Sequence, residues 1–328
     1  MSNVEARPVE VTCGEEDAGD RGVEVITARD VPLGGPRAMT VRRTLPSRRR
    51  TMVGAWCFVD HYGPDDVSET GGMVVPPHPH AGLQTVSWLF SGEVEHRDSL
   101  GTHAMVRPGE LNLMTAGHGI SHSEVSTPET TTLHGVQLWV ALPASAAEAE
   151  PDFERYRAEP VAVDGAVVSV FVGALGVPGH DVPASPVVTR SPLLGAELTL
   201  LPGARLALSV DPAHEHGVLV DSGTVRVQGR QVERAELAFV PAGSPSLEVV
   251  AVGEDAARVV LLGGEPFGEQ IVMWWNFIGR SHEDVVAARA QWQAELAGAE
   301  AERFGRFDYP GDSLPAPELP GVRLRPRG

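Results

Sequence analysis

The chain has 328 residues, and its 26 basic residues against 44 acidic ones give a formal net charge of −18 at pH 7. This length allows two domains with a buried core, and 36 glycines with 27 prolines favour short strands and turns over long helices. The acidic balance argues against direct contact with nucleic acid, because phosphates attract basic surfaces. Two cysteines cannot form a disulfide framework, the acidic start lacks the apolar core of a signal peptide, and no run approaches about 20 apolar residues. We therefore expect a cytoplasmic protein that does not enter a membrane.

Short β-type runs, broken by Gly, Pro and Asp, fill two halves of the chain that are separated by a polar, alanine-rich segment. This pattern predicts an all-β protein. The expected parts, in chain order, are a flexible acidic arm (1–22), a first barrel (23–145), a linker (146–160), a second barrel (161–280), a short helix (281–304) and an irregular tail (305–328).

The helix is predicted from its start signal and its period. Ser281 can serve as the N-cap, and Asp284 stands at the capping-box position. The apolar residues that recur at helical spacing are Val285, Ala288, Trp292 and Leu296.

The two halves contain an internal repeat. The segment GELNLMTAG at 109–117 matches AELAFVPAG at 235–243 without a gap, and Gly92 can be aligned with Gly223. A repeated all-β unit of this size indicates two similar barrels in tandem.

The first half contains two pairs of possible metal ligands. His78 and His80 flank Pro79 before a strand, and residues two apart in a strand point to the same face. His122 and Glu124 repeat that spacing after a glycine-rich turn. If the two strands are neighbours, three imidazoles and one carboxylate converge, which suits a divalent first-row metal. No thiolate lies nearby in the sequence, so a closed structural zinc site is not expected.

Other histidines of the first half fit this set less well. His118 could replace His122, but it lies inside the glycine-rich turn, so we expect it to act as an outer partner of the ligands. His96, His103 and His134 have no partner at a useful spacing and are predicted to be ordinary residues.

The second half also has a His-x-His pair, His214 and His216, but in another register. With the repeated glycines superposed, His216 falls opposite Thr85 and not opposite the first histidine pair. The positions that match the second ligand pair hold Glu248 and Val250. We therefore expect the second barrel to contain no metal.

The sequence resembles the pirins, a family of the cupin superfamily. The matching segments are FVDHYGP (58–64), HPHAGLQTVSWLFSGEVEHRDSLG (78–101), TAGHGISHSE (115–124) and LHGVQLWVALP (133–143). The resemblance implies two tandem cupin barrels of the double-stranded β-helix, or jelly-roll, type. It also implies a single metal site in the N-terminal barrel, with ligands His78, His80, His122 and Glu124. Gln84 departs from the glutamate found at that place in many relatives, which affects the tuning of the site more than metal binding.

The family is associated with quercetin 2,3-dioxygenase activity. The resemblance therefore implies that a flavonol-like aromatic substrate and O2 react at the metal, with Glu124 as the base. Iron(II) is expected first, and manganese, nickel, copper, cobalt and zinc stay open. Gln137 or His118 could orient the ligands. The apolar residues that could stack on a flat substrate, or simply form barrel core, are Trp56, Phe58 and Met114.

Two other functions stay open at this stage. The first is a non-enzymatic regulator, in which the redox state of the metal is sensed by a protein partner. The second is a metal enzyme of another kind, such as an isomerase, because a fold does not fix a function.

Overall fold

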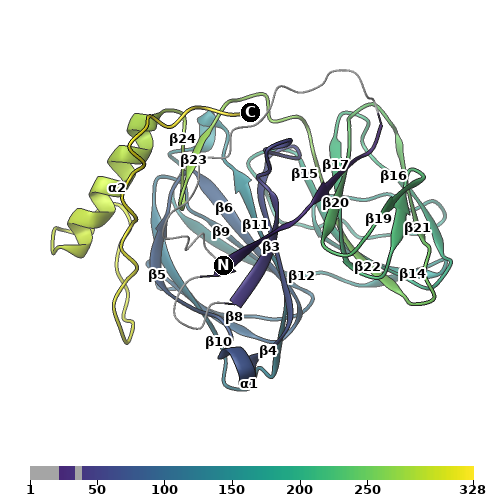
Figure 1. Ribbon diagram of the computed structural model, residues 1–328, viewed down its shortest axis with the longest axis horizontal. Coiled ribbons are helices and arrows are strands. Elements are labelled where there is room, and N and C mark those ends of the chain that lie inside the picture. Colours follow the sequence, from purple (N-terminus) through teal and green to yellow (C-terminus); the bar gives the residue numbers. More distant parts are fainter. Residues whose placement is uncertain (1–21, 34–38) are drawn as a thin grey trace.

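The chain forms two β-sandwiches that lie side by side, with a helix and a long tail against the outer side of the first (Figure 1). This computed structural model describes residues 22–33 and 39–328. Each sandwich, or barrel, pairs a seven-stranded sheet with a four-stranded sheet, and every strand pair within them is antiparallel. The predicted all-β fold with two repeated barrels is confirmed. The predicted arm at 1–22 lies, except for Gly22, outside the described residues.

The first barrel holds the predicted ligand pairs. Its seven-stranded sheet has the order β12 (Asp152–Arg157), β9 (Glu110–Thr115), β6 (Leu83–Ser91), β11 (Thr132–Ala141), β4 (Trp56–Asp66), β3 (Met39–Leu45) and β2 (Arg29–Leu33). Its four-stranded sheet has the order β5 (Val74–His80), β10 (Ile120–Ser126), β7 (Val94–Asp98) and β8 (His103–Val106). Two short helices connect strands, α1 (Val67–Thr70) and η1 (Ala144–Ala146).

The second barrel repeats this arrangement. Its seven-stranded sheet has the order β1 (Glu24–Thr27), β20 (Glu236–Val240), β17 (Glu215–Ser222), β22 (Ala257–Gly264), β15 (Leu193–Leu200), β14 (Ala166–Val172) and β13 (Val161–Val163). Its four-stranded sheet has the order β16 (Arg205–Ser209), β21 (Ser246–Ala251), β18 (Val225–Val227) and β19 (Arg230–Val232). β9 and β20, which carry the repeated segments, occupy equivalent places, as the repeat predicts.

Two strands lie outside the halves in which the sequence placed them. β1 was expected in the first barrel, but it pairs with β20 of the second. β12 lies within the predicted linker, but it pairs with β9 and extends the first barrel. β12 has the sequence DFERYR and lies at the edge of its sheet. Edge strands are often rich in charged residues, so their composition resembles that of a loop. The two barrels therefore each hold a strand from beyond their predicted boundaries.

The C-terminal helix has the predicted start and a shorter span. α2 (His282–Leu296) begins with the capping box of Ser281 and Asp284. It ends at Leu296 and not at residue 304, because Gly298 takes a left-handed backbone conformation with φ 104°. Leu296, expected in the buried stripe, is exposed, while Glu295 is buried and accepts hydrogen bonds from the chain that follows.

The segment after the second barrel returns to the first one. The hairpin of β23 (Val272–Trp274) and β24 (Phe277–Gly279) bridges to Ala81, and the tail bonds to Pro77 beside β5. Residues 271–280, predicted as part of the second barrel, thus pack against the first barrel beside the end of β5. Residues 305–328 contain no helix or strand, as predicted. Among the described residues, no helix is long and apolar enough to cross a membrane.

The two barrels differ in what fills them. Between the two seven-stranded sheets lies a shared apolar core that includes Trp56, Trp88 and Phe171. The interior of the second barrel is a cluster of Val, Leu and Ala side chains. The interior of the first barrel contains buried histidine, glutamate, asparagine and glutamine side chains. Burying polar groups is costly unless they form hydrogen bonds or bind a metal or ligand, so the interior of the first barrel is the candidate location of a functional site.

Candidate metal centre

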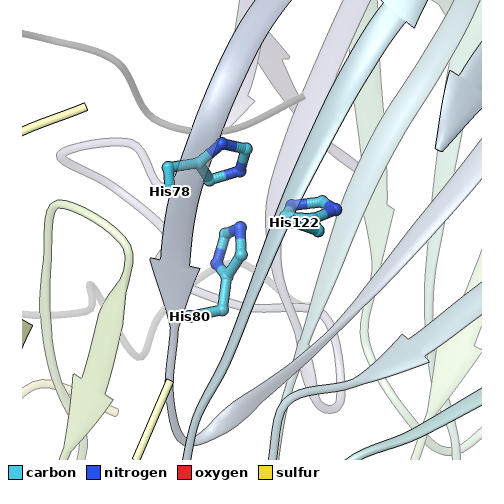
Figure 2. Close-up of side chains that lie close together, drawn as sticks. All are labelled: His78, His80 and His122. Atoms are coloured by element: carbon cyan, nitrogen blue, oxygen red, sulfur yellow. The ribbon is translucent and has the colours of Figure 1, made fainter. Parts of the chain in front are cut away.

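Three histidines converge inside the first barrel. The candidate ligand atoms of His78, His80 and His122 lie within 4.8 Å of one another. The ring centroids of His78 and His122 are 4.3 Å apart, and that of His80 lies 5.1 Å from His78 and 5.0 Å from His122. Figure 2 shows the three rings turned toward one another from two adjacent strands.

The sheet register explains this meeting. β5 and β10 are antiparallel neighbours, and His122 is the direct partner of His78. His80 follows two residues later on β5 and so points to the same face. Pro79 pairs with Ser121 at the end of β5, where the missing N–H of a proline costs little. The His-x-His spacing therefore acts as the sequence predicts.

Burial keeps these imidazoles neutral. All three side chains are almost fully buried. Burial lowers the pKa of His78 to about 4. Burial, together with the neighbouring imidazoles, holds the pKa of His80 and His122 well below the ordinary value. Neutral imidazole carries the lone pair that a metal needs.

The hydrogen-bond partners of His78 and His122 show whether a nitrogen lone pair is available to a metal between the three rings. His78 Nδ1 donates to the carbonyl of Pro76 at 2.7 Å, so its Nε2 carries a lone pair. His122 Nε2 is buried and has no hydrogen-bond partner among the described residues. Converging imidazole lone pairs in an enclosed space fit a divalent transition metal.

Glu124 is buried beside the three imidazoles, but its carboxylate is farther from them than they are from one another. Its side chain is buried on the same strand as His122, yet its carboxylate oxygens fall outside the set of atoms within 4.8 Å of one another. The register of β5 with β10 shifts between His122 and Glu124, because two residues separate Val75 from His78 on β5 while only Ser123 separates His122 from Glu124 on β10, so the bulge lies on β5. Ser87 Oγ lies 3.4 Å from Glu124 Oε1 and donates at 2.8 Å to Gln137 Oε1.

Two residues next to the histidines were missed. His96, predicted to be ordinary, is buried with its Nδ1 3.3 Å from His122 Nδ1. Its Nε2 lies 3.0 Å from Asp98 Oδ2, and Asp98 is also buried. The signal was the His-x-Asp spacing on β7, which places both side chains on one face, as in the ligand pairs. The alternate residues Glu95 and Arg97 are charged, so the sequence of β7 does not show that the face with His96 and Asp98 points inward.

The predicted accessory residues have other contacts. His118 Nδ1 approaches the carbonyl of Ala149 at 3.3 Å and takes no part in the imidazole group, so His122 is the third histidine. Gln84 donates to Thr115 Oγ1 at 2.8 Å on the opposite face of β6 from Ser87, toward the second barrel. Gln137 contacts Ser87 and not a histidine. The expectation that Gln84 or His118 tunes the site has no contact to support it.

The aromatic residues expected to hold a substrate are engaged elsewhere. Trp56 belongs to the core between the barrels and donates from Nε1 to the carbonyl of Gly263 at 3.0 Å. Phe58 stacks on Trp139 with centroids 4.0 Å apart and packs under the Arg43 guanidinium. Met114 belongs to a small apolar cluster with Ala116 and Ile120, against which Phe153 packs. Of these aromatic rings, Trp139 lies nearest the site, 5.2 Å from the His80 ring.

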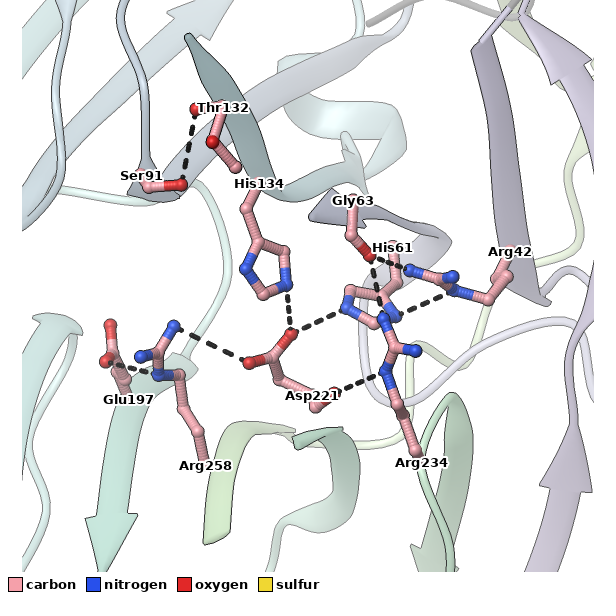
Figure 3. A network of polar contacts seen from close by, with 10 residues as sticks. All are labelled: Arg42, His61, Gly63, Ser91, Thr132, His134, Glu197, Asp221, Arg234 and Arg258. Carbon is pink, nitrogen blue, oxygen red and sulfur yellow. Dashed lines mark hydrogen bonds and ion pairs between the residues drawn. The ribbon is translucent and has the colours of Figure 1, made fainter. Parts of the chain in front are cut away.

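A second group of possible ligands involves the seven-stranded sheet of the first barrel, on its face toward the second barrel. Within the described chain, His61, His134 and Asp221 also have candidate ligand atoms within 4.8 Å of one another. Asp221 Oδ1 accepts from His61 Nε2 at 2.7 Å and from His134 Nε2 at 2.5 Å (Figure 3). His134 was predicted to be ordinary, and the structure shows instead that it links the two barrels.

In the second barrel, His214 and His216 have ring centroids 6.2 Å apart, and His214 precedes the strand that carries His216. Glu248 and Val250 alternate with the residues of β21 that fill the interior, namely Leu247, Val249 and Ala251. The inward positions of β21 are therefore apolar, and the matched residues Glu248 and Val250 are not among the side chains that fill the interior. The absence of a metal from this barrel stays a prediction.

Comparison with known proteins agrees with this architecture. A family model described as Pirin matches residues 38–140, and one described as Pirin C-terminal cupin domain matches residues 195–297. The chain is 43% identical over 302 residues, or 90% of either chain, to a Pseudomonas aeruginosa protein named "Putative quercetin 2,3-dioxygenase". It is 32% identical over 222 residues to Pirin of Homo sapiens, which covers 65% of this chain and 74% of the human protein.

Solved structures show the same two barrels. The crystal structure of a quercetin 2,3-dioxygenase from Acinetobacter baumannii superposes with a TM-score of 0.83 at 37% identity, covering 92% of this chain and 97% of that one. A bacterial pirin from Escherichia coli in complex with nickel(II) shares the fold, with a TM-score of 0.56 at 20% identity over 75% of this chain and all of that one. On the sequence identities and the two family matches, the chain belongs to the pirin family.

Proposed function

We propose that the protein is a mononuclear metal-dependent dioxygenase that opens the ring of a flavonol such as quercetin. The observation that carries this proposal is the convergence of three neutral, buried imidazoles, with no hydrogen-bond partner for the Nε2 of His122 among residues 22–33 and 39–328. His78, His80 and His122 would hold one divalent metal, and Glu124 would be its fourth ligand or the nearby base. Iron(II) is the first candidate because it supports chemistry with O2, while the N/O ligand set does not choose among neighbouring metals.

The residues around the site have definable roles in this reaction. A bound divalent metal would acidify a flavonol hydroxyl, as metals do for bound water. Glu124 would accept the proton of that hydroxyl on a carboxylate oxygen. The Ser87 hydroxyl, 3.4 Å from Glu124 Oε1 and 2.8 Å from Gln137 Oε1, could donate its single proton to only one of these two acceptors at a time. The ring opening would consume O2 and release carbon monoxide.

The interior also offers hydrogen-bonding groups for a polyhydroxylated substrate. Both side-chain polar atoms of Asn112, Gln137 Nε2 and Trp139 Nε1 are buried without a hydrogen bond in the described part of the chain. Asn112 and Gln137 are cross-strand partners of Ser87, so they share its inward face. Buried groups of this kind are normally satisfied, so they favour a ligand with several hydroxyl and carbonyl oxygens. The name of the Pseudomonas aeruginosa relative agrees with such a substrate.

The test is turnover under controlled oxygen. Protein loaded with iron(II) without air, then given quercetin and air, should release carbon monoxide as the flavonol absorbance falls. Glu124→Gln and His78→Ala should abolish both signals, while His103→Gln, which changes an exposed histidine of the same barrel, should not. Turnover that persists in both site variants would exclude this site as its source. Intact metal binding without turnover of any flavonol would favour the regulatory alternative.

A further inference from the structure

His122 makes its closest polar side-chain contact with another histidine. Its Nδ1 lies 3.3 Å from His96 Nδ1, and both rings are buried. At such a contact one nitrogen must carry the proton and the other the lone pair, so the two tautomers depend on each other. Only one of the two directions leaves a lone pair on His122 Nε2.

Asp98 decides the direction. Its Oδ2 lies 3.0 Å from His96 Nε2, and its Oδ1 accepts from the backbone N–H groups of Leu100 and Thr102 at 2.9 and 3.0 Å. The carboxylate is thus fixed by the turn between β7 and β8 and presents only an acceptor to His96. His96 therefore donates from Nε2 and accepts at Nδ1. The opposite direction would set the Nε2 lone pair of His96 against a carboxylate oxygen.

The ring of His96 is also held in place. It stacks on Phe153 with centroids 4.6 Å apart and planes inclined by 29°. Phe153 lies on β12, the strand from the predicted linker, where it is the partner of Met114 on β9. The register of β7 with β10 places Asp98 opposite His122 and His96 opposite Glu124. Three strands therefore hold one chain of hydrogen bonds.

We propose that Asp98 and His96 are positioning residues that fix His122 as the Nδ1–H tautomer, so that its Nε2 lone pair is presented to the metal. The order of donors runs from His122 Nδ1–H to His96 Nδ1, and from His96 Nε2–H to Asp98 Oδ2. His78 reaches the same state by donating its Nδ1–H to the carbonyl of Pro76. This inference rests on the metal site of the proposed function, but it requires neither a flavonol nor O2.

Asp98→Asn tests the chain with almost no change of shape. The amide oxygen can keep the two turn hydrogen bonds, while the amide N–H faces His96 Nε2 and reverses the direction of donation. His122 should then carry its proton on Nε2. Outer partners of this kind typically change metal affinity by about 10- to 100-fold. We expect that loss for nickel(II), measured by competition with a chelator. The matched control is Glu95→Gln, the same change one residue before His96 at a surface ion pair, which should bind nickel(II) within twofold of the parent.

A second measurement separates positioning from a structural defect. Two-bond 1H–15N spectra of the metal-free protein should show His122 protonated on Nδ1 in the parent and on Nε2 in Asp98→Asn. His96→Phe keeps a ring to stack on Phe153 but removes the acceptor, and it should also weaken nickel(II) binding by about tenfold or more. If Asp98→Asn does not fold, His96→Phe decides. Affinity within twofold of the parent in the folded variants, or an unchanged His122 tautomer in Asp98→Asn, overturns the inference. Because no flavonol is present, failure of the dioxygenase proposal leaves this test intact.

Discussion

Two groups of histidines lie on opposite sides of the seven-stranded sheet of the first barrel, and distance alone does not distinguish them. The inner group, His78, His80 and His122, lies inside the barrel. The outer group, His61, His134 and Asp221, lies between the barrels, where β17 of the second barrel supplies the aspartate. Both meet the same 4.8 Å condition, so a search by proximity would count two metal sites.

Their surroundings differ in the direction of the hydrogen bonds. In the inner group, the outward nitrogen of His78 donates, which leaves a lone pair on the inward nitrogen. In the outer group, Arg42 Nε donates to His61 Nδ1 at 3.3 Å, so the proton of His61 is on Nε2 and already bonds to Asp221. Figure 3 shows Arg42, Arg234 and Arg258 around this group, and Arg258 Nη1 lies 3.5 Å from Asp221 Oδ2. A metal would meet N–H groups and guanidinium charge here, so we interpret the outer group as a fastening between the barrels.

The largest expected effect that separates the groups is on metal binding. His78→Ala removes one of three converging imidazoles, and nickel(II) affinity should fall by at least about 100-fold. His61→Ala changes an equally buried histidine of the outer group and should leave affinity within about twofold. Chelator competition and metal analysis after desalting would measure both.

The reverse result would contradict this assignment of the two groups. If His61→Ala lost metal while His78→Ala kept it, the outer group would be the metal site. Two metals bound per chain in the parent, with one lost in each variant, would contradict the view that the outer group is only a fastening.

Asp221→Asn should reverse the pattern by lowering stability without affecting metal. The buried carboxylate accepts from two imidazoles and lies beside Arg258, whereas an amide would direct an N–H at one of these donors. Leaving buried charged and polar groups unpaired should cost about 2–4 kcal/mol in the free energy of unfolding. Urea unfolding measures this loss. Glu283→Gln, at an exposed ion pair with Arg323, is the control and should change stability little.

The inner group was predictable from the sequence because its information is local. A spacing of two residues sets the face in any strand, so His78, His80 and His122 needed only the assumption that β5 and β10 are neighbours. Glu124 followed from the same rule, but its carboxylate oxygens fall outside the close imidazole group and lie beside Ser87, which the spacing alone does not reveal.

The outer group was not predictable because its information is distant. His61 and Asp221 are 160 positions apart and meet only when two seven-stranded sheets pack face to face. The strand exchange at β1 and β12 was missed for the same reason, since edge pairing depends on tertiary contacts and not on composition. The repeat, in contrast, predicted two similar barrels, because the turn glycines Gly92 and Gly223 both require a positive φ.

Acidification should lower the stability of the metal-free protein through the inner group at a higher pH than through the outer group. The folded pKa of His78 is about 4, below the ordinary value of about 6.5 expected in the unfolded chain. Its contribution to stability is therefore complete above pH 6.5 and is lost as the pH falls toward 4, by about 2 kcal/mol between pH 6.5 and 5. Hydrogen bonds from His134 and His61 outweigh the effect of burial and hold the pKa of Asp221 below its usual value, so the Asp221 contribution is lost only below about pH 4.

The measurement is the free energy of unfolding from pH 7.5 to 5 for the metal-free parent and for His78→Gln. The variant should lose less stability over this range, because one titrating imidazole is gone. Asp221→Asn should keep the parent's contribution from the inner group. Equal pH dependence in the parent and in His78→Gln would show that His78 is not buried as a neutral base.

The smallest effect is expected for His134→Gln, which removes the more exposed imidazole of the outer group. The side chain of His134 is 12% exposed, and a glutamine amide N–H can replace its donation to Asp221. The loss should be about 0.5–1 kcal/mol of stability, the usual net value of one hydrogen bond, and nickel(II) affinity should not change. His103→Gln, an exposed histidine paired with Glu95, is the control. A loss of metal from His134→Gln would contradict the fastening role, because a residue that only joins the barrels has no lone pair committed to an ion. A small loss of stability with full metal binding would show that the direction of hydrogen bonds, and not the proximity of histidines, separates the two groups.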